Sequence, residues 1–388
     1  MTNPTSSEAR LPAPAELMER ARAATSLNDF GGGDFIEGLD RFWEGLVREA
    51  RLSDGGLLEQ VGLIERRLAN RLQIERWFEE NPHTANSVVD APVTITGLPR
   101  TGTTALVNMM SQDKRFRLLR SWEQAQPCPP PRAGDDNDPR RQAALAVKDR
   151  LARERPDLMA MHLYDPDATD EDVEILGLSF HSQQLVLPIY AYHAWWRDAD
   201  LRDTFLYHRR VMQLLQSQCP PSRWLFKAPA HSYHMEAFFH AYPGARVIVT
   251  HRDPGKAIPS SVSFVGALQE GRAFADPVAA GRHLADHLRI GTERLMEARS
   301  RIGEDSFCDV HHEEFLADPF GTIERIYDFI GWDLPPAVRA RMQEWQAKNR
   351  SGAHGAHRYQ AEQFGLRAED IRIDCAKYIA RYGIAVEI

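Results

Sequence analysis

Apolar residues recur at three- and four-residue steps through the first part of the chain. The stretches FIEGLDRFWEGLVREARL and LLEQVGLIERRLANRLQIERWF, within residues 14–80, separate these apolar positions by charged ones. Such spacing is typical of amphipathic helices that bury one face. We therefore predict a helical segment over residues 1–90 that packs on a core formed by the rest of the chain.

The pattern changes at Val93, where β-branched residues lead to Gly97 and are followed by the helix-like run TTALVNMMSQ. Further short apolar runs, each separated from the next by a helix-like stretch, lie at 223–227, 245–250 and 306–312. Strands that alternate with helices favour a parallel sheet covered on both faces. The predicted fold class is α/β, with a parallel sheet of about five strands flanked by helices over residues 91–388.

A proline-rich, acidic stretch interrupts this α/β pattern at residues 126–139. Its sequence, QPCPPPRAGDDNDP, is predicted to be a loop because consecutive prolines prevent regular backbone hydrogen bonding. The residues that follow are helical in pattern and rich in aromatic side chains, so we expect a helical insertion over 133–220. These aromatic residues fit either the wall of an apolar pocket or the core.

Charge and cysteine content narrow the classes of function. The 47 Lys and Arg residues against 55 Asp and Glu residues give a formal charge of -8, with both signs spread along the chain. We therefore expect no general affinity for nucleic acid. The four cysteines lie far apart without C-x-x-C spacing, and no window approaches about 18 consecutive apolar residues. The expectation is a cytoplasmic protein without a membrane span, with a homodimer left open.

The stretch VTITGLPRTGTT has the composition of an anion-binding loop. Two glycines allow the backbone to curl so that its N–H groups point inward, and the following helix presents its positive end there. Thr103 stands where nucleotide-hydrolysing enzymes have a lysine, which weakens an interpretation as a nucleoside triphosphatase. The predicted anion-binding residues are Gly97, Leu98, Pro99, Arg100, Thr101, Gly102, Thr103 and Thr104.

A second anion-binding pair is predicted from RVIVTHRDPGKAIPSSVSF. Arg252 follows a buried strand, and Asp253 and Pro254 fit the N-cap and first position of a helix. Arg252 and Ser260 could then converge on a second anion at the sheet edge where open α/β sheets bind ligands. Pro259 is expected to disturb the start of this helix because it removes a hydrogen-bond donor.

A lysine and a histidine follow the strand in RWLFKAPAHSYHMEAF. Lys227 at the end of that strand could stabilise a leaving anion, and His231 could move a proton. Two other groups, HHEE at 311–314 and HGAH at 354–357, contain residue types that bind metals. Neither has a third ligand at ligand-like spacing, so we expect no metal site.

Together, TGLPRTGTT, LFKAPAH and VIVTHRDPGKAIPSS resemble the sulfotransferases that use 3'-phosphoadenosine 5'-phosphosulfate (PAPS), in particular a bacterial branch of that superfamily. The resemblance implies a P-loop NTPase-like sulfotransferase fold. It also implies that residues 99–104 bind the 5'-phosphosulfate, and that Arg252 and Ser260 bind the 3'-phosphate. HHEEFLADPFGTIERIYDFIGWDL and HGAHRYQAEQFGL resemble later segments of these enzymes. In place of their Lys-x-Gly-x-x-Gly run stand Arg350, Gly352, Gly355 and Arg358, with Arg358 a further candidate for donor binding.

The implied reaction transfers a sulfuryl group in line from PAPS to an acceptor hydroxyl, without a metal. Arg100 and Lys227 are then expected to stabilise the developing charge. The resemblance favours Glu123 as the base, because several relatives carry a catalytic glutamate at that place. His231 is a second candidate, although its spacing from Lys227 differs from that in the cytosolic enzymes. The third candidate is an acidic cluster formed by Asp170, Glu171, Asp172 and Glu174.

Two rival functions use the same nucleotide site. One is a phosphate-loop nucleotide kinase or NTPase, with VIVTHRD as the strand end that holds magnesium. The other is a nucleotide-binding protein without catalysis. For the sulfotransferase, we expect a small hydroxylated acceptor that is partly apolar. The apolar part is inferred from Phe180, Tyr190, Tyr192, Trp195 and Trp196.

Overall fold

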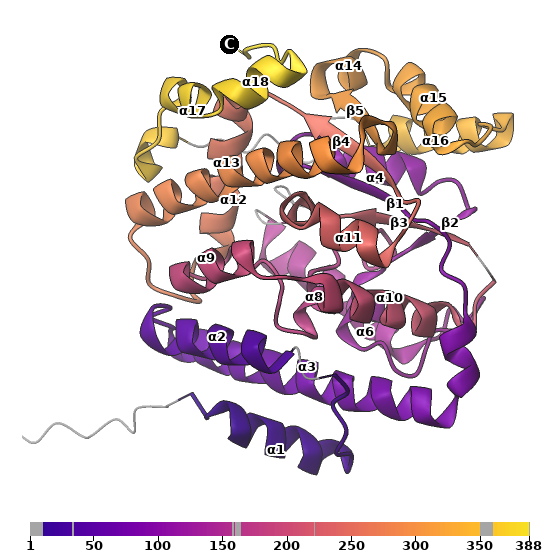
Figure 1. Ribbon diagram of the computed structural model, residues 1–388, viewed down its shortest axis with the longest axis vertical. Helices are drawn as coiled ribbons and strands as arrows, with labels where there is room; N and C mark the ends of the chain where they lie inside the picture. The colour runs from indigo at the N-terminus through magenta and orange to yellow at the C-terminus, as the bar shows by residue number, and fades with distance from the viewer. Residues whose placement is uncertain are drawn as a thin grey trace, which may run out of the picture.

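The computed structural model describes residues 11–32, 35–156, 159, 164–220, 222–349 and 360–387. Its strands are β1 (Val93–Gly97), β2 (Phe116–Leu118), β3 (Arg223–Lys227), β4 (Arg246–His251) and β5 (Phe307–His311). They form one parallel sheet in the order β2-β3-β1-β4-β5, with helices on both faces (Figure 1). The predicted α/β class with a five-stranded parallel sheet is confirmed.

The helices before β3 are α1 (Pro14–Thr25), α2 (Phe35–Arg48), α3 (Asp54–Glu80), α4 (Thr103–Met110), α5 (Ser121–Ala125), α6 (Pro139–Glu154), α8 (Val173–Gly177), α9 (Tyr190–Asp198) and α10 (Arg202–Gln216). The later ones are α11 (Met235–Ala241), α12 (Pro254–Gln269), α13 (Pro277–Ile302), α14 (His312–Ala317), α15 (Pro319–Ile330), α16 (Pro336–Lys348), α17 (Ala368–Asp374) and α18 (Ala376–Tyr382). Short 3-10 turns lie at η1 (Pro82–Asn86), η2 (Pro229–Tyr233), η3 (Glu304–Ser306) and η4 (Ala361–Phe364).

Alternate residues of the central strand face different hydrophobic clusters. Val93 and Ile95 pack with apolar residues of α4, α15 and α16, whereas the hydroxyls of Thr94 and Thr96 meet η2 on the other face. Because side chains alternate along a strand, β1 has one apolar face and one polar, hydrogen-bonded face. The polar face places hydrogen-bonding groups directly beneath the carboxyl end of the sheet.

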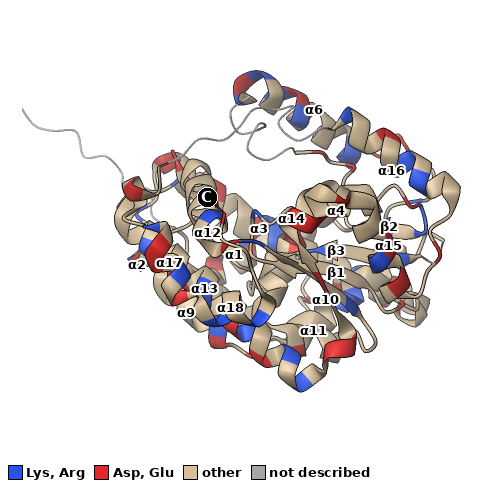
Figure 2. Cartoon of the chain, turned by 90° about the horizontal axis from the view of Figure 1, so that it is seen from above, with Lys and Arg blue, Asp and Glu red and all other residues tan. Residues whose placement is uncertain are grey.

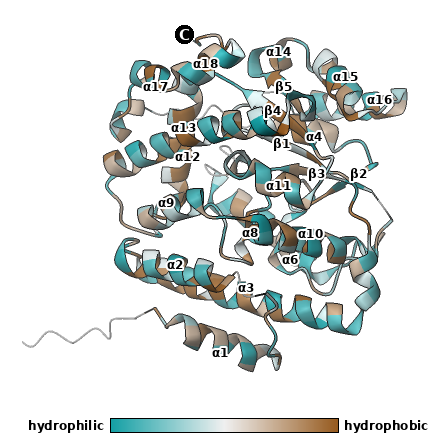
Figure 3. Ribbon diagram, viewed as in Figure 1, coloured by the Kyte–Doolittle hydropathy of each residue, from teal (hydrophilic) through white to brown (hydrophobic). Residues whose placement is uncertain are grey.

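The N-terminal helices share a hydrophobic core with the sheet. Phe42 of α2 and Leu68 of α3 belong to the same buried cluster as Phe205 of α10, Phe226 of β3 and Val247 of β4. Figure 3 shows hydrophobic and hydrophilic residues along both α2 and α3, and α3 also buries charged side chains such as Arg67 and Arg71. The division of the chain near residue 90 stays a prediction, as does the boundary of the insertion at 133–220.

Two local expectations had different outcomes. Asp253 caps α12 as expected, because its side chain accepts a hydrogen bond from Gly255 N. The expected disturbance at Pro259 was wrong, since α12 runs without a break from Pro254 to Gln269. Strand β2 was not singled out in the sequence, because only three residues, Phe116–Leu118, pair with β3 at the edge of the sheet.

Charged residues of both signs are interspersed over the outer helices. Figure 2 shows Lys and Arg beside Asp and Glu on α6, α15 and α17. In the described ranges no helix is long and apolar enough to cross a membrane.

Candidate active site

The loop between β1 and α4 is curled by its two glycines. Gly97 has φ 123° and Gly102 has φ 90°, values that residues with a Cβ rarely adopt. A Cβ on Gly97 would lie 2.4 Å from the Thr250 carbonyl oxygen, and one on Gly102 would lie 3.0 Å from His312 Nδ1. Arg100, between the glycines, also has a positive φ of 66°. The loop therefore winds tightly ahead of the first amides of α4, an arrangement that holds anions in proteins.

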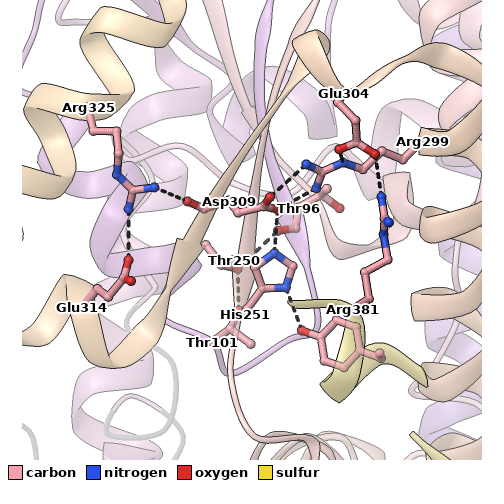
Figure 4. A network of polar contacts seen from close by, with 11 residues as sticks. Thr96, Thr101, Thr250, His251, Arg299, Glu304, Asp309, Glu314, Arg325 and Arg381 are labelled. Atoms are coloured by element: carbon pink, nitrogen blue, oxygen red, sulfur yellow. Dashed lines mark hydrogen bonds and ion pairs between the residues drawn. The ribbon is translucent and has the colours of Figure 1, made fainter. Parts of the chain in front are cut away.

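Hydroxyl groups beneath the loop fix its shape (Figure 4). The buried Thr101 donates from Oγ1 to the Leu98 carbonyl oxygen at 2.7 Å, and its Oγ1 lies 2.6 Å from Thr250 Oγ1. Thr250 in turn donates to the Thr96 carbonyl oxygen at 3.2 Å. Thr101 therefore ties the loop to the carboxyl ends of β1 and β4, and its hydroxyl points into the sheet.

The other loop residues divide into buried and accessible ones. The Leu98 side chain is buried with apolar residues of α12 and α13, and Pro99 is half-buried. Thr103 is buried at the first position of α4. Thr104 is half-buried and lines a polar cavity that also reaches Lys227. Of the three loop threonines, only Thr104 thus lines the cavity that also contains Lys227.

Arg100 contacts both Ser260 and Arg252, while the binding of a shared anion by Arg252 and Ser260 stays a prediction. Arg100 donates from Nε to Ser260 Oγ at 3.3 Å, and Arg252 donates from Nη1 to the Arg100 carbonyl oxygen at 2.9 Å. The Arg100 guanidinium also lies 5.7 Å from the centre of the Phe264 ring. Arg252 further bonds both carboxylate oxygens of Glu387. Two guanidinium groups and a hydroxyl therefore meet at the carboxyl edge of β1 and β4.

Lys227 lies at the end of β3, on the other side of β1. Its side chain is only 2% exposed, and its Nζ lies 3.1 Å from Glu171 Oε1. Lys227 borders a polar cavity of about 240 Å³ over α4. The other residues around this cavity include Thr104, Asn108, Tyr164, Asp165 and Asp170. A buried ammonium beside a half-exposed carboxylate thus faces the space next to the loop.

His231 is enclosed beneath the sheet. Its Nδ1 lies 2.9 Å from Thr94 Oγ1, and its Nε2 lies 2.6 Å from Asp172 Oδ2. His208 Nε2 lies 3.2 Å from the same oxygen of Asp172. Burial alone would raise the pKa of Asp172, but the neighbouring His231 and His208 outweigh it and hold that pKa below its usual value. Both ring nitrogens of His231 therefore contact protein groups, and the side chain is fully buried.

Glu123 is likewise a buried, paired carboxylate. It is the third residue of α5, and its Oε2 accepts from Arg120 N in a capping arrangement at the start of that helix. Its Oε1 accepts from Arg117 Nη2 at 2.7 Å. The side chain has no exposed surface, so these contacts hold the position of α5 and β2 relative to one another.

The acidic cluster at 170–174 separates in space. Glu171 pairs with Lys227, Asp172 with the two buried histidines, and Glu174 with Arg66 and Arg67. Asp170 lines the polar cavity, and its backbone N–H donates to the Leu119 carbonyl oxygen at 2.9 Å. Each residue of this stretch therefore has a different environment, which the sequence pattern alone could not distinguish.

Two further cavities lie near the loop. One of about 530 Å³ is lined by Gly102, Ala105, His312 and Trp345. The His312 Nδ1 atom is buried without a hydrogen-bond partner. The second, of about 420 Å³, is mostly apolar and runs between α12, α13 and the segment before α9. Among the aromatic residues expected to form an acceptor pocket, Tyr190 lines this cavity, while Phe180, Tyr192 and Trp196 are buried in the core.

Sequence reasoning missed several residues at these sites. Tyr164 and Glu387 carry no motif of their own, His312 was considered only as part of the HHEE segment, and Glu171 only as a member of a cluster. Glu171 and its partner Lys227 lie 56 positions apart along the chain. Arg358 and its neighbours at 350–357, including HGAH, lie outside the described residues. Within the described ranges, no group of three or more His, Cys, Asp or Glu residues is arranged to hold a metal.

The arrangement of sheet, loop and strand-end arginine defines a P-loop-type α/β fold. The family model described as "Sulfotransferase family" matches residues 92–336. The chain therefore belongs to the Sulfotransferase family. That match spans all five strands and both arginines, Arg100 and Arg252.

Individual relatives agree with this membership. The chain is 28% identical to sulfotransferase STF9 from Mycobacterium avium, with a TM-score of 0.89 over 99% of this chain and 100% of that one. It is 26% identical to sulfotransferase STF1 from Mycobacterium tuberculosis H37Rv, with a TM-score of 0.84 over 95% and 99%. It is also 23% identical to omega-hydroxy-beta-dihydromenaquinone-9 sulfotransferase Stf3 of Mycobacterium bovis over 41% of this chain. The match spans 40% of the length of Stf3.

Proposed function

We propose that the protein transfers a sulfuryl group from PAPS to a hydroxyl of a partly apolar small molecule. The observation that carries this proposal is the convergence of Arg100, Arg252 and Ser260 at one edge of the sheet, beside the curled loop. A phosphosulfate already carries an activated sulfuryl group, so amides, hydroxyls and cations are a sufficient cradle. The threonine at position 103, in place of lysine, fits such a donor better than a nucleoside triphosphate.

The described residues fit the parts of this donor. The curled loop, in which a Cβ on Gly97 would clash, suits the 5'-phosphosulfate. Arg252 and Ser260 suit the 3'-phosphate, since guanidinium groups bind phosphates through two parallel hydrogen bonds. The cavity of about 530 Å³ on the outer side of α4 suits the nucleoside, and the unpartnered His312 Nδ1 opens toward the loop there.

Lys227 and Arg100 are proposed to stabilise charge during the transfer. The acceptor oxygen attacks sulfur while the bond between sulfur and the bridging oxygen breaks, and negative charge grows on that oxygen. Lys227 is held beneath the surface with its ammonium toward the polar cavity, where low exposure strengthens its field. Arg100 approaches from the opposite side of β1. A base removes the proton that the acceptor oxygen loses.

Glu171 is the base that we propose. Glu123 and His231 have no exposed surface and make close contacts with other protein groups. The side chain of Glu171 is 36% exposed, and its Oε1 lies 3.1 Å from the Nζ of Lys227, which lines the cavity. A base must come within hydrogen-bond distance of the proton that it accepts. Of the three candidates, Glu171 is placed where an acceptor could reach it, with Asp170 as the neighbouring alternative.

The acceptor is proposed to be an alcohol with a substantial apolar part. The cavity of about 420 Å³ begins at Val262, close to Ser260 along α12, and is lined by Leu185, Leu284 and other apolar side chains. Its size lies within the usual range for small-molecule sites. The relative Stf3 is named as a sulfotransferase of a hydroxylated menaquinone. A hydroxylated isoprenoid quinone is therefore the first acceptor to test.

The decisive experiment compares two nucleotides by titration calorimetry. Adenosine 3',5'-bisphosphate without magnesium should bind, and ATP with magnesium should bind at least about tenfold more weakly, which corresponds to about 1.4 kcal/mol. Arg252→Gln should weaken the binding of adenosine 3',5'-bisphosphate and leave the binding of ATP with magnesium unchanged. Arg246→Gln, at the opposite end of β4, is the matched control and should change neither affinity.

Transfer of labelled sulfate to a panel of alcohols then separates an enzyme from a nucleotide-binding protein. Stronger binding of ATP with magnesium would instead favour a kinase or NTPase. Binding of the bisphosphate with no transfer to any acceptor of the panel would favour a protein that only binds the nucleotide.

A further inference from the structure

Glu387 binds the edge of the Arg252 guanidinium to which a phosphate group would bind. Its carboxylate oxygens accept from Arg252 Nε at 2.7 Å and from Nη2 at 2.8 Å. Paired contacts of this kind are the geometry by which guanidinium groups bind both carboxylates and phosphates. The third nitrogen, Nη1, holds the loop through the Arg100 carbonyl oxygen. An acidic side chain of the protein therefore lies at the position proposed for the 3'-phosphate.

The backbone around Glu387 is fixed at the start of α12. Glu387 N donates to Asp253 Oδ2 at 2.9 Å, and the Glu387 carbonyl oxygen accepts from Arg372 Nη2 at 3.1 Å. Arg372 also bonds both oxygens of Asp253. Since Asp253 caps α12, the main chain of residue 387 is attached to the same helix that carries Ser260. The backbone that carries this carboxylate is thus held in place independently of Arg252.

Helix α18, just before this segment, is anchored to the same edge of the sheet. Tyr378 OH lies 3.0 Å from His251 Nδ1, and His251 Nε2 lies 2.8 Å from Asp309 Oδ1. Arg299 bonds Asp309 and Glu304, and Glu304 also pairs with Arg381 of α18 (Figure 4). Figure 1 shows the yellow helices α17 and α18 above α13; α18 contacts α13, and α17 contacts α12. This network keeps the segment 384–387 beside Arg252.

We infer that Glu387 is a built-in competitor for the 3'-phosphate site, which the donor must displace from Arg252. This inference rests on the proposed function. The hydrogen bond from Arg252 lowers the pKa of Glu387, so the competitor is an anion at neutral pH. A phosphate monoester carries about -1.5 to -2 charges against one for the carboxylate, and it therefore wins the exchange. The side chains of Arg252 and Glu387 are 25% and 36% exposed, so the released carboxylate can reach water.

The exchange makes a specific demand on the ligand. A nucleotide without a 3'-phosphate leaves the ion pair between Arg252 and Glu387 intact. Its affinity should therefore not change when the Glu387 carboxylate is removed. A nucleotide with a 3'-phosphate has to break the pair. Loss of the competing carboxylate should therefore tighten binding only of the nucleotide that has a 3'-phosphate. Partly exposed ion pairs contribute up to about 1 kcal/mol, which converts to about fivefold in the dissociation constant.

The test measures the affinity of adenosine 3',5'-bisphosphate and adenosine 5'-monophosphate for the full chain by calorimetry. Glu387→Gln should bind the bisphosphate about fivefold more tightly than the wild type and the monophosphate equally well. Glu369→Gln is the matched control, because it makes the same change of charge on α17 at a side chain that is 67% exposed. It should alter neither dissociation constant. Glu387→Asp, whose shorter side chain weakens the paired contact, should give an intermediate gain.

A double-mutant cycle tests whether the effect passes through Arg252. In an Arg252→Ala background, Glu387→Gln should no longer change the affinity for the bisphosphate. Unchanged affinity in both Glu387 variants, with tight bisphosphate binding by the wild type, would overturn the inference and leave the proposed function standing. An equal gain for Glu369→Gln or for the monophosphate would also overturn it, because a general charge effect would then explain the result. No bisphosphate binding in any variant would overturn the proposed function and the inference together.

Discussion

The loop at the sheet edge and the polar layer beneath the sheet are built in opposite ways. At the edge, the glycines, Arg100 and Ser260 surround the loop, and Thr101 ties the loop to Thr250 of β4. Beneath the sheet, His231, Asp172 and Thr94 are closed on each other across more than fifty positions of sequence. The Arg100 side chain therefore stays partly accessible, whereas the histidine and the aspartate beneath the sheet are fully enclosed.

The two regions differ in whether their charged side chains are accessible or are buried against other protein groups. Lys227 and Glu171 contact each other, while Lys227 lines an open cavity and the side chain of Glu171 is 36% exposed. Glu123 and His231 contact protein groups and have no exposed surface. Because groups that take part in catalysis have to reach the substrate, this distinction predicts which substitutions affect turnover and which affect stability.

The largest contrast is expected between two glutamates. Glu171→Gln should lower the rate of sulfuryl transfer by about 10²- to 10⁴-fold, the usual contribution of a general base. Glu123→Gln should instead lower the free energy of unfolding, because Arg117 then keeps a buried charge without its partner. Single-turnover rates and urea unfolding of both variants make the comparison. The opposite pattern, with Glu171→Gln fully active and folded Glu123→Gln inactive, would identify Glu123 as the base.

Lys227→Met should reduce turnover by about 10²- to 10³-fold, the cost of losing a group that stabilises transition-state charge. Its control is Lys114→Met, since Lys114 lines the same cavity and has no role in the proposed transfer. Initial rates at saturating donor measure the effect. Equal rates for the two variants would remove Lys227 from the mechanism.

Asp172→Asn should lower the free energy of unfolding by about 3 kcal/mol, because a buried carboxylate that contacts two histidines is lost. The pKa of Asp172 is depressed in the folded state, so its stabilising contribution is present above the ordinary aspartate pKa, near 4, and is lost as the pH falls. The acid sensitivity of stability should therefore be weaker in the variant. Urea unfolding at several pH values measures it, and a steeper acid dependence in the variant would contradict the assignment.

Thr101→Val should have the smallest effect. It removes the hydroxyl that bonds the Leu98 carbonyl oxygen and contacts Thr250, at a cost of about 1 kcal/mol in unfolding free energy. Donor binding should weaken only a few-fold, because the backbone of the loop is still confined by its glycines. A thermal shift combined with calorimetry tests this. A complete loss of binding without any change in stability would mean that Thr101 contacts the ligand directly.

The sheet and the loop were accessible from the sequence because their signals are local. The run of β-branched residues, the glycines at 97 and 102 and the strand-end Arg252 each lie within one short stretch. The convergence of Arg252 with Ser260 was equally accessible, since eight residues of one turn and helix connect them. Short strand β2 escaped notice because three residues carry too little pattern.

The partners of each polar side chain could not be predicted in the same way. Nothing near Glu171 in sequence indicates Lys227, and nothing near Arg252 indicates Glu387, 135 residues later. These pairs depend on how α17, α18 and the segment before α8 fold back over the sheet. The adjacent residues Glu171 and Asp172 illustrate the limit, because the side chain of Glu171 is partly exposed and that of Asp172 is buried under the sheet.

The separation between Arg252 and Glu387 also has a consequence for synthesis of the protein. Strand β4 and the start of α12 leave the ribosome well before Arg372, Tyr378 and Glu387, which complete their contacts. At about 5–20 residues per second, a delay of roughly ten seconds separates the two events. During that interval the nascent chain exposes Arg252 and the Asp253 carboxylate without these ion-pair partners. This edge of the molecule therefore acquires these native contacts only after α17 and α18 have been synthesised.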